Sequence, residues 1–138
     1  MKLFSSGNQG QSLIETIISL TVAFLVISSL VAGVVMAIRN TRFAKNQSLA
    51  TKLAQEAIEK VRAYRDQNGW SVFKANCGNE AAVGFTNLPS PFDSLSTDPI
   101  QCVEDGSPER VKVTVTISWS EGGRVHQSKL TTYLTRWQ

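Results

Sequence analysis

The sequence predicts an α+β protein in which one long N-terminal helix packs against a small C-terminal antiparallel sheet. Three observations lead to this fold class. An uncharged, mostly apolar run extends over 23 residues from Thr16 to Ile38, apolar residues recur at helical spacing over 49–61, and apolar and polar residues alternate over 111–119. A helix with one apolar stripe and a sheet with one apolar face bury both surfaces by packing together. We therefore expect a membrane-spanning first half of the helix and an amphipathic second half.

The apolar run is long enough to cross a membrane. At 1.5 Å per residue, a helix of this length spans about 35 Å, whereas the hydrocarbon core of a bilayer is about 30 Å thick. The apolar region of a secretory signal is shorter, at about 7–15 residues, although Ala32 and Ala37 leave a weaker alternative of signal cleavage. With 138 residues in total, the chain is expected to be one small domain attached to this segment.

The second half of the helix is predicted from four-residue steps. Leu49, Leu53, Ala57 and Val61 follow one another at this spacing, with Ala50, Ala54 and Ile58 alongside. Glu56 and Lys60 are placed for an ion pair one turn apart, and Asn68 with Gly69 supplies a stop signal. One helix is therefore predicted from about Leu13 to Gln67.

The C-terminal part is predicted to be β-structure. Apolar residues occupy every second position from Val111 to Trp119, and "SEGGR" is typical of a tight turn. The segment after this turn is predicted to return antiparallel, with Leu130, Thr132 and Leu134 on one face. Because isolated two-stranded hairpins are marginally stable, a third strand is expected, between Val72 and Phe85.

The segment between these elements, residues 86–110, contains all four prolines and is predicted to be a surface loop. The two cysteines, Cys77 and Cys102, are compatible with one disulfide if the domain is exported. We hypothesise this bond, with two free packed thiols as the alternative. Closing the loop of about 26 residues would contribute roughly 3.5 kcal/mol in the chain-entropy model.

The residues around the start of the apolar run form a motif. The first ten residues, "MKLFSSGNQG", carry one charged side chain and end in Gly10, and Glu15 stands one residue before the run. This string resembles the prepilin leader of type IV pilins and of the pseudopilins of type II secretion. The resemblance implies cleavage between Gly10 and Gln11 by a membrane aspartic prepilin peptidase, N-methylation of Gln11, and a role for Glu15 in assembly.

Glu15 also raises a physical question, because a carboxylate at a helix centre in a bilayer costs about 2.5–3.5 kcal/mol, and less near the edge. The resemblance implies that the N-terminal ammonium of a neighbouring subunit, carried by its Gln11, offsets this cost inside a filament. Attraction between opposite charges is stronger there than in water, which would favour one axial register. The alternative is a glutamate that reaches the membrane interface and has no partner.

The resemblance extends along the chain. The string "LAQEAIEKVRAYRDQNGW" is similar to the corresponding region of minor pilins classed as type IV pilus modification proteins. The implied organisation is a leader at 1–10, an apolar transmembrane and filament-core helix at 11–39 (the apolar segment), an amphipathic helix half at 40–68, and a β-rich headpiece at 69–138. The implied fold is type IV pilin-like.

The function implied by the resemblance is that of a structural subunit, a minor pilin, of a type IV pilus or related filament. The expected partners are other pilin subunits, the prepilin peptidase, the pilus assembly machinery and, before assembly, membrane lipid. The expected location is the cytoplasmic membrane as a single-pass protein, then an extracellular or periplasmic filament. Two alternatives remain: a pseudopilin of a type II secretion or DNA-uptake system, and an uncleaved single-pass anchored binding protein.

Residues that could support other chemistry are few, and we expect no enzyme activity, no cofactor and no metal. His126, the single histidine, falls in a strand pattern with no nucleophile motif around it, which favours a strand-surface side chain. Carboxylates in "VEDGSPE" lack the spacing of a calcium loop.

A net charge of +3 makes nucleic acid an unlikely partner. A headgroup contact or an inter-subunit salt bridge better suits the sparse basic residues after the apolar run. These basic residues are Arg39, Arg42, Lys45 and Lys52.

Overall fold

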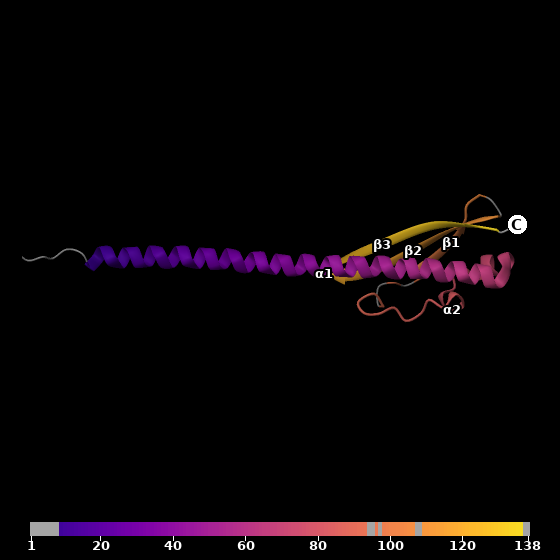
Figure 1. Ribbon diagram of the computed structural model, residues 1–138, viewed down its shortest axis with the longest axis horizontal. Coiled ribbons are helices and arrows are strands. Elements are labelled where there is room, and N and C mark those ends of the chain that lie inside the picture. The colour runs from indigo at the N-terminus through magenta and orange to yellow at the C-terminus, as the bar shows by residue number, and fades with distance from the viewer. Residues whose placement is uncertain (1–8, 94–95, 97, 107–108, 137–138) are drawn as a thin grey trace, which may run out of the picture. The chain divides into compact units, whose positions relative to one another are not determined.

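A computed structural model describes residues 9–93, 96, 98–106 and 109–136, with side chains from residue 13 onward. Its elements are the helices α1 (Gln9–Asn76) and α2 (Glu80–Val83) and the strands β1 (Ile100–Glu104), β2 (Arg110–Glu121) and β3 (Arg124–Thr135). The predicted fold class is confirmed: a long N-terminal helix is followed by a three-stranded antiparallel sheet of order β1-β2-β3 (Figure 1). The described chain divides into two compact units, Met1–Arg42 and Phe43–Gln138.

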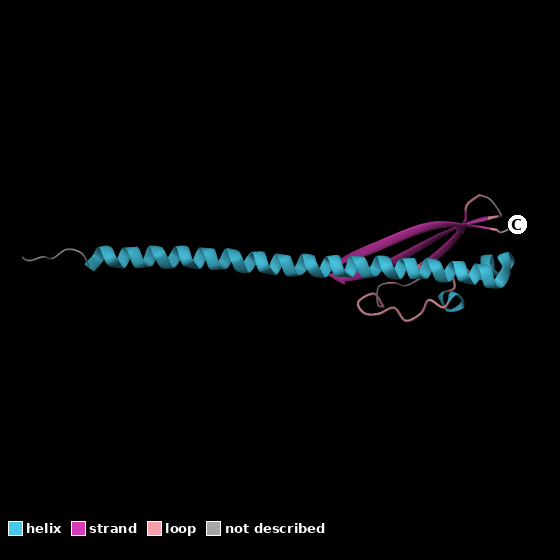
Figure 2. Ribbon diagram, in the orientation of Figure 1, coloured by secondary structure: helices cyan, strands magenta, loops and turns pink. Residues whose placement is uncertain are grey.

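In the second unit, the sheet packs on the apolar stripe of α1. Ala50, Ala54 and Ala57 are fully buried in α1 and form one cluster with the inward residues of β2. Because protein cores are close-packed, we expect a larger side chain at these fully buried positions to be accommodated poorly. Figure 2 shows the strands running along this part of the helix. The remaining buried members of the stripe and of β2 are Ile58, Val61, Val111, Val113, Val115, Ile117 and Trp119.

The β2–β3 hairpin has the predicted turn and register. Glu121 pairs with Arg124 across Gly122 and Gly123, which have φ of 62° and 76°. Two consecutive positive φ angles are the conformation of a two-residue hairpin turn that matches strand twist, and glycine adopts them without steric cost. In β3, Leu134 is buried and Leu130 is half-buried on the helix side, as predicted.

The third strand was predicted in the wrong place. Residues 72–85 contain the end of α1, Cys77 and the short helix α2, whereas the third strand is β1, inside the segment predicted to be a surface loop. β1 has five residues, of which Ile100 alone is fully buried, so its alternation is too short to be recognised. It pairs with β2 from Val111 to Val115.

Phe92, in the same segment, also belongs to the core. Phe92 and the preceding Phe85 are buried, and residues just before the start of β1 accept hydrogen bonds from the edge of β2. The Thr116 amide donates to the Pro99 carbonyl at 2.9 Å, and the Ser118 amide donates to the Ser96 hydroxyl at 2.9 Å. These bonds supply partners to β2 amides that lie past the segment paired with β1, because buried backbone amides need partners.

The end of α1 differs from the prediction as well. Gly69 has φ 72° and ψ 161°, so the helical geometry does break at the predicted stop, but helical residues resume and continue to Asn76. The fully buried Phe73 explains the continuation, since its ring packs into the core and against Trp70 with ring centroids 5.3 Å apart. The predicted ion pair between Glu56 and Lys60 is present at 3.1 Å.

Candidate functional site

The apolar segment is exposed around its whole circumference. Every described side chain from Leu13 to Arg42 is exposed, including Phe24 at 70% and Leu30 at 64%. Soluble monomers rarely expose contiguous apolar patches of more than a few hundred Å². The helix is long and apolar enough to cross a membrane by length and composition. The segment is therefore a candidate membrane span.

Four hydroxyl side chains of the apolar segment donate hydrogen bonds to carbonyls of the helix itself. Thr21 donates to the carbonyl of Ile17 and Ser28 to that of Phe24, each at 2.8 Å. Such bonds hide polar groups where water is absent. The same pattern holds for the Thr16 hydroxyl with Leu13, for Ser29 with Val26 and, just after the segment, for Thr41 with Ala37. The surface available to a neighbour is thus mostly apolar despite these hydroxyl side chains.

Glu15 is the one acidic residue in the sequence of the apolar segment. Its side chain is exposed on α1, and no ion pair joins it to another residue in the described part of the chain. The backbone of Gly10 and Gln11 lies in the first turn of α1, but their side chains are outside the described set, as are leader residues 1–8. Cleavage after Gly10 and methylation of Gln11 therefore stay predictions.

Small residues occur at four-residue spacing on the same segment. Ser29, Gly33 and Ala37 follow one another one turn apart, and a Cβ atom added at Gly33 meets nothing within 4 Å. Small side chains at this spacing let the backbones of two apolar helices approach closely. The segment thus carries both an apolar surface and a place for close helix contact.

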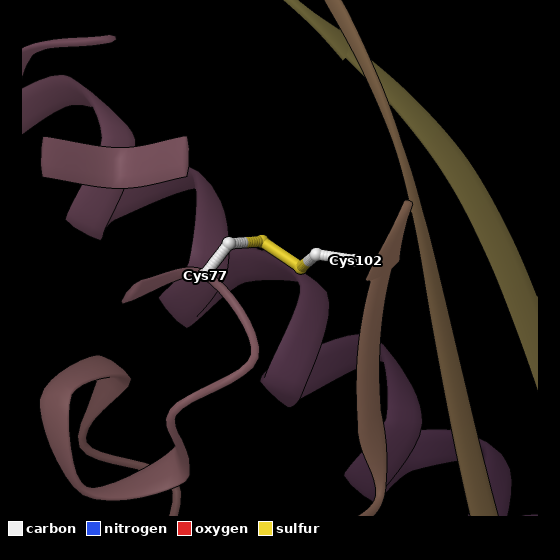
Figure 3. The surroundings of a disulfide bond; sticks show 2 residues. All are labelled: Cys77 and Cys102. Carbon is white, nitrogen blue, oxygen red and sulfur yellow. A yellow bond between two sulfur atoms is a disulfide. The ribbon is translucent and has the colours of Figure 1, made fainter. Parts of the chain in front are cut away.

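Cys77 and Cys102 form a disulfide, as hypothesised (Figure 3). Their Cα atoms are 6.0 Å apart, and the bond joins the residue that follows α1 to strand β1. Cys77 is 1% exposed. The closed loop contains α2, Phe85 and Phe92, so the bond holds the loop at the position where its aromatic residues enter the core.

Removing this disulfide should destabilise the second unit markedly. For Cys77→Ala with Cys102→Ala we expect a loss of about 3.5 kcal/mol in free energy of unfolding, because the unfolded chain regains the entropy of an open loop. Alanine is preferred to serine, since a hydroxyl at the buried Cys77 position would lack a partner. Guanidinium unfolding of both proteins, with and without reductant, measures the effect. Wild-type stability that does not change with reductant would contradict the expectation.

One carboxyl group in the closed loop has a perturbed titration. Glu80 begins α2, and its Oε1 is buried with no hydrogen-bond partner among the described residues. Burial, and secondarily the charge of Asp98, raises the pKa of the Glu80 carboxyl above its ordinary value of 4.5. The ionised carboxylate is therefore disfavoured in the folded protein.

The sign of the resulting pH effect follows from proton binding. Between pH 4.5 and the higher folded pKa, the folded state binds more protons than the unfolded state, so stability falls as the pH rises through this window. Glu80→Gln is expected to raise the melting temperature at neutral pH, with a gain that disappears below pH 4.5. Asp98→Asn should give a smaller gain of the same sign. Thermal unfolding between about pH 4 and 8 tests this, and a gain independent of pH would exclude Glu80 titration as the cause.

The other residues considered from the sequence have ordinary surroundings. His126 is half-buried on β3, and its ring stacks on Trp119 at 5.6 Å and meets the edge of Phe43 at 5.0 Å. In the loop considered for calcium, Glu104 pairs with Lys74 and Asp105 with Arg110. No group of three potential metal ligands occurs among the described residues. Side chains of Arg39, Arg42, Lys45 and Lys52 are exposed.

One feature was not found from the sequence. An open groove surrounds Trp70, directly after the break at Gly69, and residues from the far end of the chain contribute to it, among them Arg136. The sequence feature that could have indicated this groove is Trp70, a large aromatic residue immediately after the predicted helix stop. Its partners come from three separate stretches of sequence, so their convergence could not be predicted without the fold.

Comparison with models of protein families, with curated proteins and with solved structures finds no match to this chain. The function of the chain is therefore argued from its own residues, chiefly the exposed apolar segment and Glu15.

Proposed function

We propose that the chain is a pilin-like structural subunit, specifically a minor pilin of a type IV pilus or related filament. The observation that carries this proposal is the combination of an apolar helical surface exposed around its whole circumference with one carboxylate, Glu15, at its start. A simple lipid anchor needs the exposed apolar surface, but the Glu15 carboxylate makes its insertion into the bilayer less favourable. A helix that leaves the bilayer to pack among identical or related helices uses both.

The proposed sequence of events begins at the leader. Prepilin peptidase removes residues 1–10 by cutting after Gly10, and Gln11 becomes a methylated N-terminus. The new ammonium group then pairs with Glu15 of a neighbouring subunit in the filament core. Gly33 is the position at which a neighbouring helix would approach most closely, because small residues allow close contact of apolar helices.

The second unit supports the proposal in a different way. Its sheet encloses the apolar stripe of α1 from Ala50 to Val61, so most of the exposed large apolar side chains lie in the segment that would enter the filament core. The disulfide is compatible with an exported domain. The proposed role requires packing and no chemistry by the chain itself.

Intact mass and N-terminal sequencing of the protein made in its host test this function. A chain that begins at Gln11 and carries one additional methyl group is the expected result. A chain that retains residues 1–10 would overturn the proposal and favour an anchored binding protein, for which the basic residues Arg39 and Arg42 after the span would bind headgroups. Genes for a prepilin peptidase and an assembly ATPase beside this one would favour a pilin or a pseudopilin over the anchored protein.

A further inference from the structure

Strand β3 forms one edge of the sheet. The strand order is β1-β2-β3, and the pairing of β3 with β2 continues without interruption over all 12 residues of β3. On its other side, β3 pairs with no strand in the described part of the chain. Strands are usually 3–10 residues long, so this edge is long. A long free edge is a place where another extended chain can pair.

Alternate residues of β3 direct their backbone groups toward this free edge. In β2, the amides of Thr116 and Ser118 donate to residues on the β1 side, so the odd-numbered residues of β2 face β3. The register pairs these with the even-numbered residues of β3. The N–H and C=O groups of odd-numbered residues of β3 therefore point away from β2. The Thr135 carbonyl agrees with this direction, because it accepts from the Arg65 guanidinium of α1 at 3.4 Å.

The odd-numbered residues before Thr135 are exposed, and no backbone hydrogen bond reaches them from outside the sheet among the described residues. Since Leu134 is buried on the helix side, their side chains lie on the opposite, outer face of the sheet. We call these five residues the β3 edge. They are Val125, Gln127, Lys129, Thr131 and Tyr133.

The side chains of the β3 edge have a symmetric pattern. Val125, Lys129 and Tyr133 follow one another in steps of four residues, with Val125 60% and Tyr133 51% exposed. Lys129 thus lies between two exposed apolar groups, and it forms no ion pair with another described residue. The strand carries a second cation, Arg124, and no acidic residue. The edge is therefore complementary to an acidic segment.

A second copy of β3 would match the apolar groups of this edge but not its charge. In antiparallel pairing centred on Lys129, the Val125 side chain of each copy lies opposite the Tyr133 side chain of the other. The same register places the two Lys129 side chains directly opposite each other. Like charges in this position destabilise a sheet, and edge lysines protect strands against pairing with their own copies. A different chain is therefore the better occupant.

We propose that the β3 edge binds an extended segment of another protein, with a carboxylate opposite Lys129 and an apolar residue four positions to either side. The segment adds a strand to the sheet through backbone hydrogen bonds. Its carboxylate pairs with Lys129, and its apolar residues pack on Val125 and Tyr133. Because the pattern is symmetric, it suits a parallel or an antiparallel segment. Nine such residues span about 26 Å.

This surface lies outside the apolar segment, so the proposal is independent of the filament function proposed above. The sequence of β3 itself supplies two matched probes. A peptide of residues 124–135 with Lys129→Glu has the proposed pattern, and the unmodified peptide differs from it only in that charge. Fluorescence polarisation of each labelled peptide, titrated with the full chain in an uncharged detergent, measures the two affinities.

The Lys129→Glu peptide is expected to bind the unmodified chain with a Kd of about 100 μM or tighter. It should bind at least about fivefold more tightly than the unmodified peptide, because one peptide places an opposite charge at Lys129 and the other a like charge. The preference should decrease at high salt.

Amide hydrogen exchange, followed by NMR on the full chain, locates the bound peptide. Without peptide, amides of the β3 edge should exchange faster than those of the even-numbered residues of β3, which are bonded to β2. The Lys129→Glu peptide should slow exchange selectively at the β3 edge.

Variants of the full chain separate charge from backbone pairing. Lys129→Glu should reverse the preference, so that the unmodified peptide binds more tightly. Lys112→Glu is the matched control: Lys112 lies on the middle strand with Val103 and Tyr133 as its neighbours on either side, so the preference should be retained. Gln127→Pro removes one edge N–H and no bond to β2, and should weaken both peptides at least threefold. If Gln127→Pro fails to fold, the reversal by Lys129→Glu still decides.

Four results would overturn the proposal. The first is the absence of saturable binding by the Lys129→Glu peptide. The second is equal affinity of the two peptides for the unmodified chain, which would remove the role of Lys129. The third is slowed exchange outside β3 alone, which would place binding elsewhere. The fourth is slow exchange at the β3 edge of the chain without peptide that is lost on dilution, which would make a second copy the occupant.

Discussion

Glu15→Gln is expected to lower incorporation of the chain into filaments by about tenfold or more, while membrane insertion is retained. The neutral amide costs less in a bilayer than the carboxylate, so insertion becomes easier. What is lost is the attraction to the N-terminal ammonium of a neighbour. A tenfold effect corresponds to about 1.4 kcal/mol, a modest value for opposite charges inside a packed helical bundle.

The ratio of the chain in sheared filaments to the chain in membranes, measured by quantitative immunoblotting in the host, tests this expectation. Glu15→Lys should be at least as defective, because it places two cations together. Glu15→Asp keeps the charge at shorter reach and should be intermediate. Glu56→Gln removes an exposed carboxylate from the second unit and serves as the control. Normal incorporation of Glu15→Gln would eliminate the charge pair and leave Glu15 as a residue at the membrane interface.

The parts of the fold that could be predicted from sequence are those with a long repeating pattern. The alternation from Val111 to Trp119 covers almost all of β2, and the steps from Leu49 to Val61 define the buried stripe of α1. In each case the same period recurs several times, so one irregular position does not obscure it. The hairpin turn was equally clear, because Gly122 and Gly123 meet a specific conformational demand.

The parts that could not be predicted depend on contacts between distant residues. β1 is a strand because Ile100 enters the core and Cys102 is bound to Cys77, and neither interaction is visible in its five residues. Helical structure after Gly69 depends likewise on burial of Phe73. For the candidate site, the roles of Gly10, Gln11 and Glu15 are predictions from a local motif, whereas the Trp70 groove is assembled from separate parts of the chain.

Trp119→Ala is expected to cost the second unit about 3–5 kcal/mol, the range for truncating a large buried aromatic residue. Trp119 is fully buried, and its ring lies 6.0 Å from Phe92, 6.2 Å from Phe43 and 5.6 Å from His126, measured between centroids. Native domains are stable by only about 5–15 kcal/mol in total. The variant therefore approaches complete unfolding at moderate temperature.

The loss should come from packing and not from hydrogen bonding, since the indole Nε1 has no partner among the described residues. Trp119→Phe should therefore cost clearly less than Trp119→Ala, and Val125→Ala, at a position 60% exposed, should change stability by about 0.5 kcal/mol at most. Guanidinium unfolding followed by near-UV circular dichroism measures the stability of all three variants.

Because Phe92 anchors its loop on the Trp119 ring, Trp119→Ala should also speed proteolysis near Phe92. A stability loss below about 1 kcal/mol would mean that the helix and sheet are held together without this aromatic cluster.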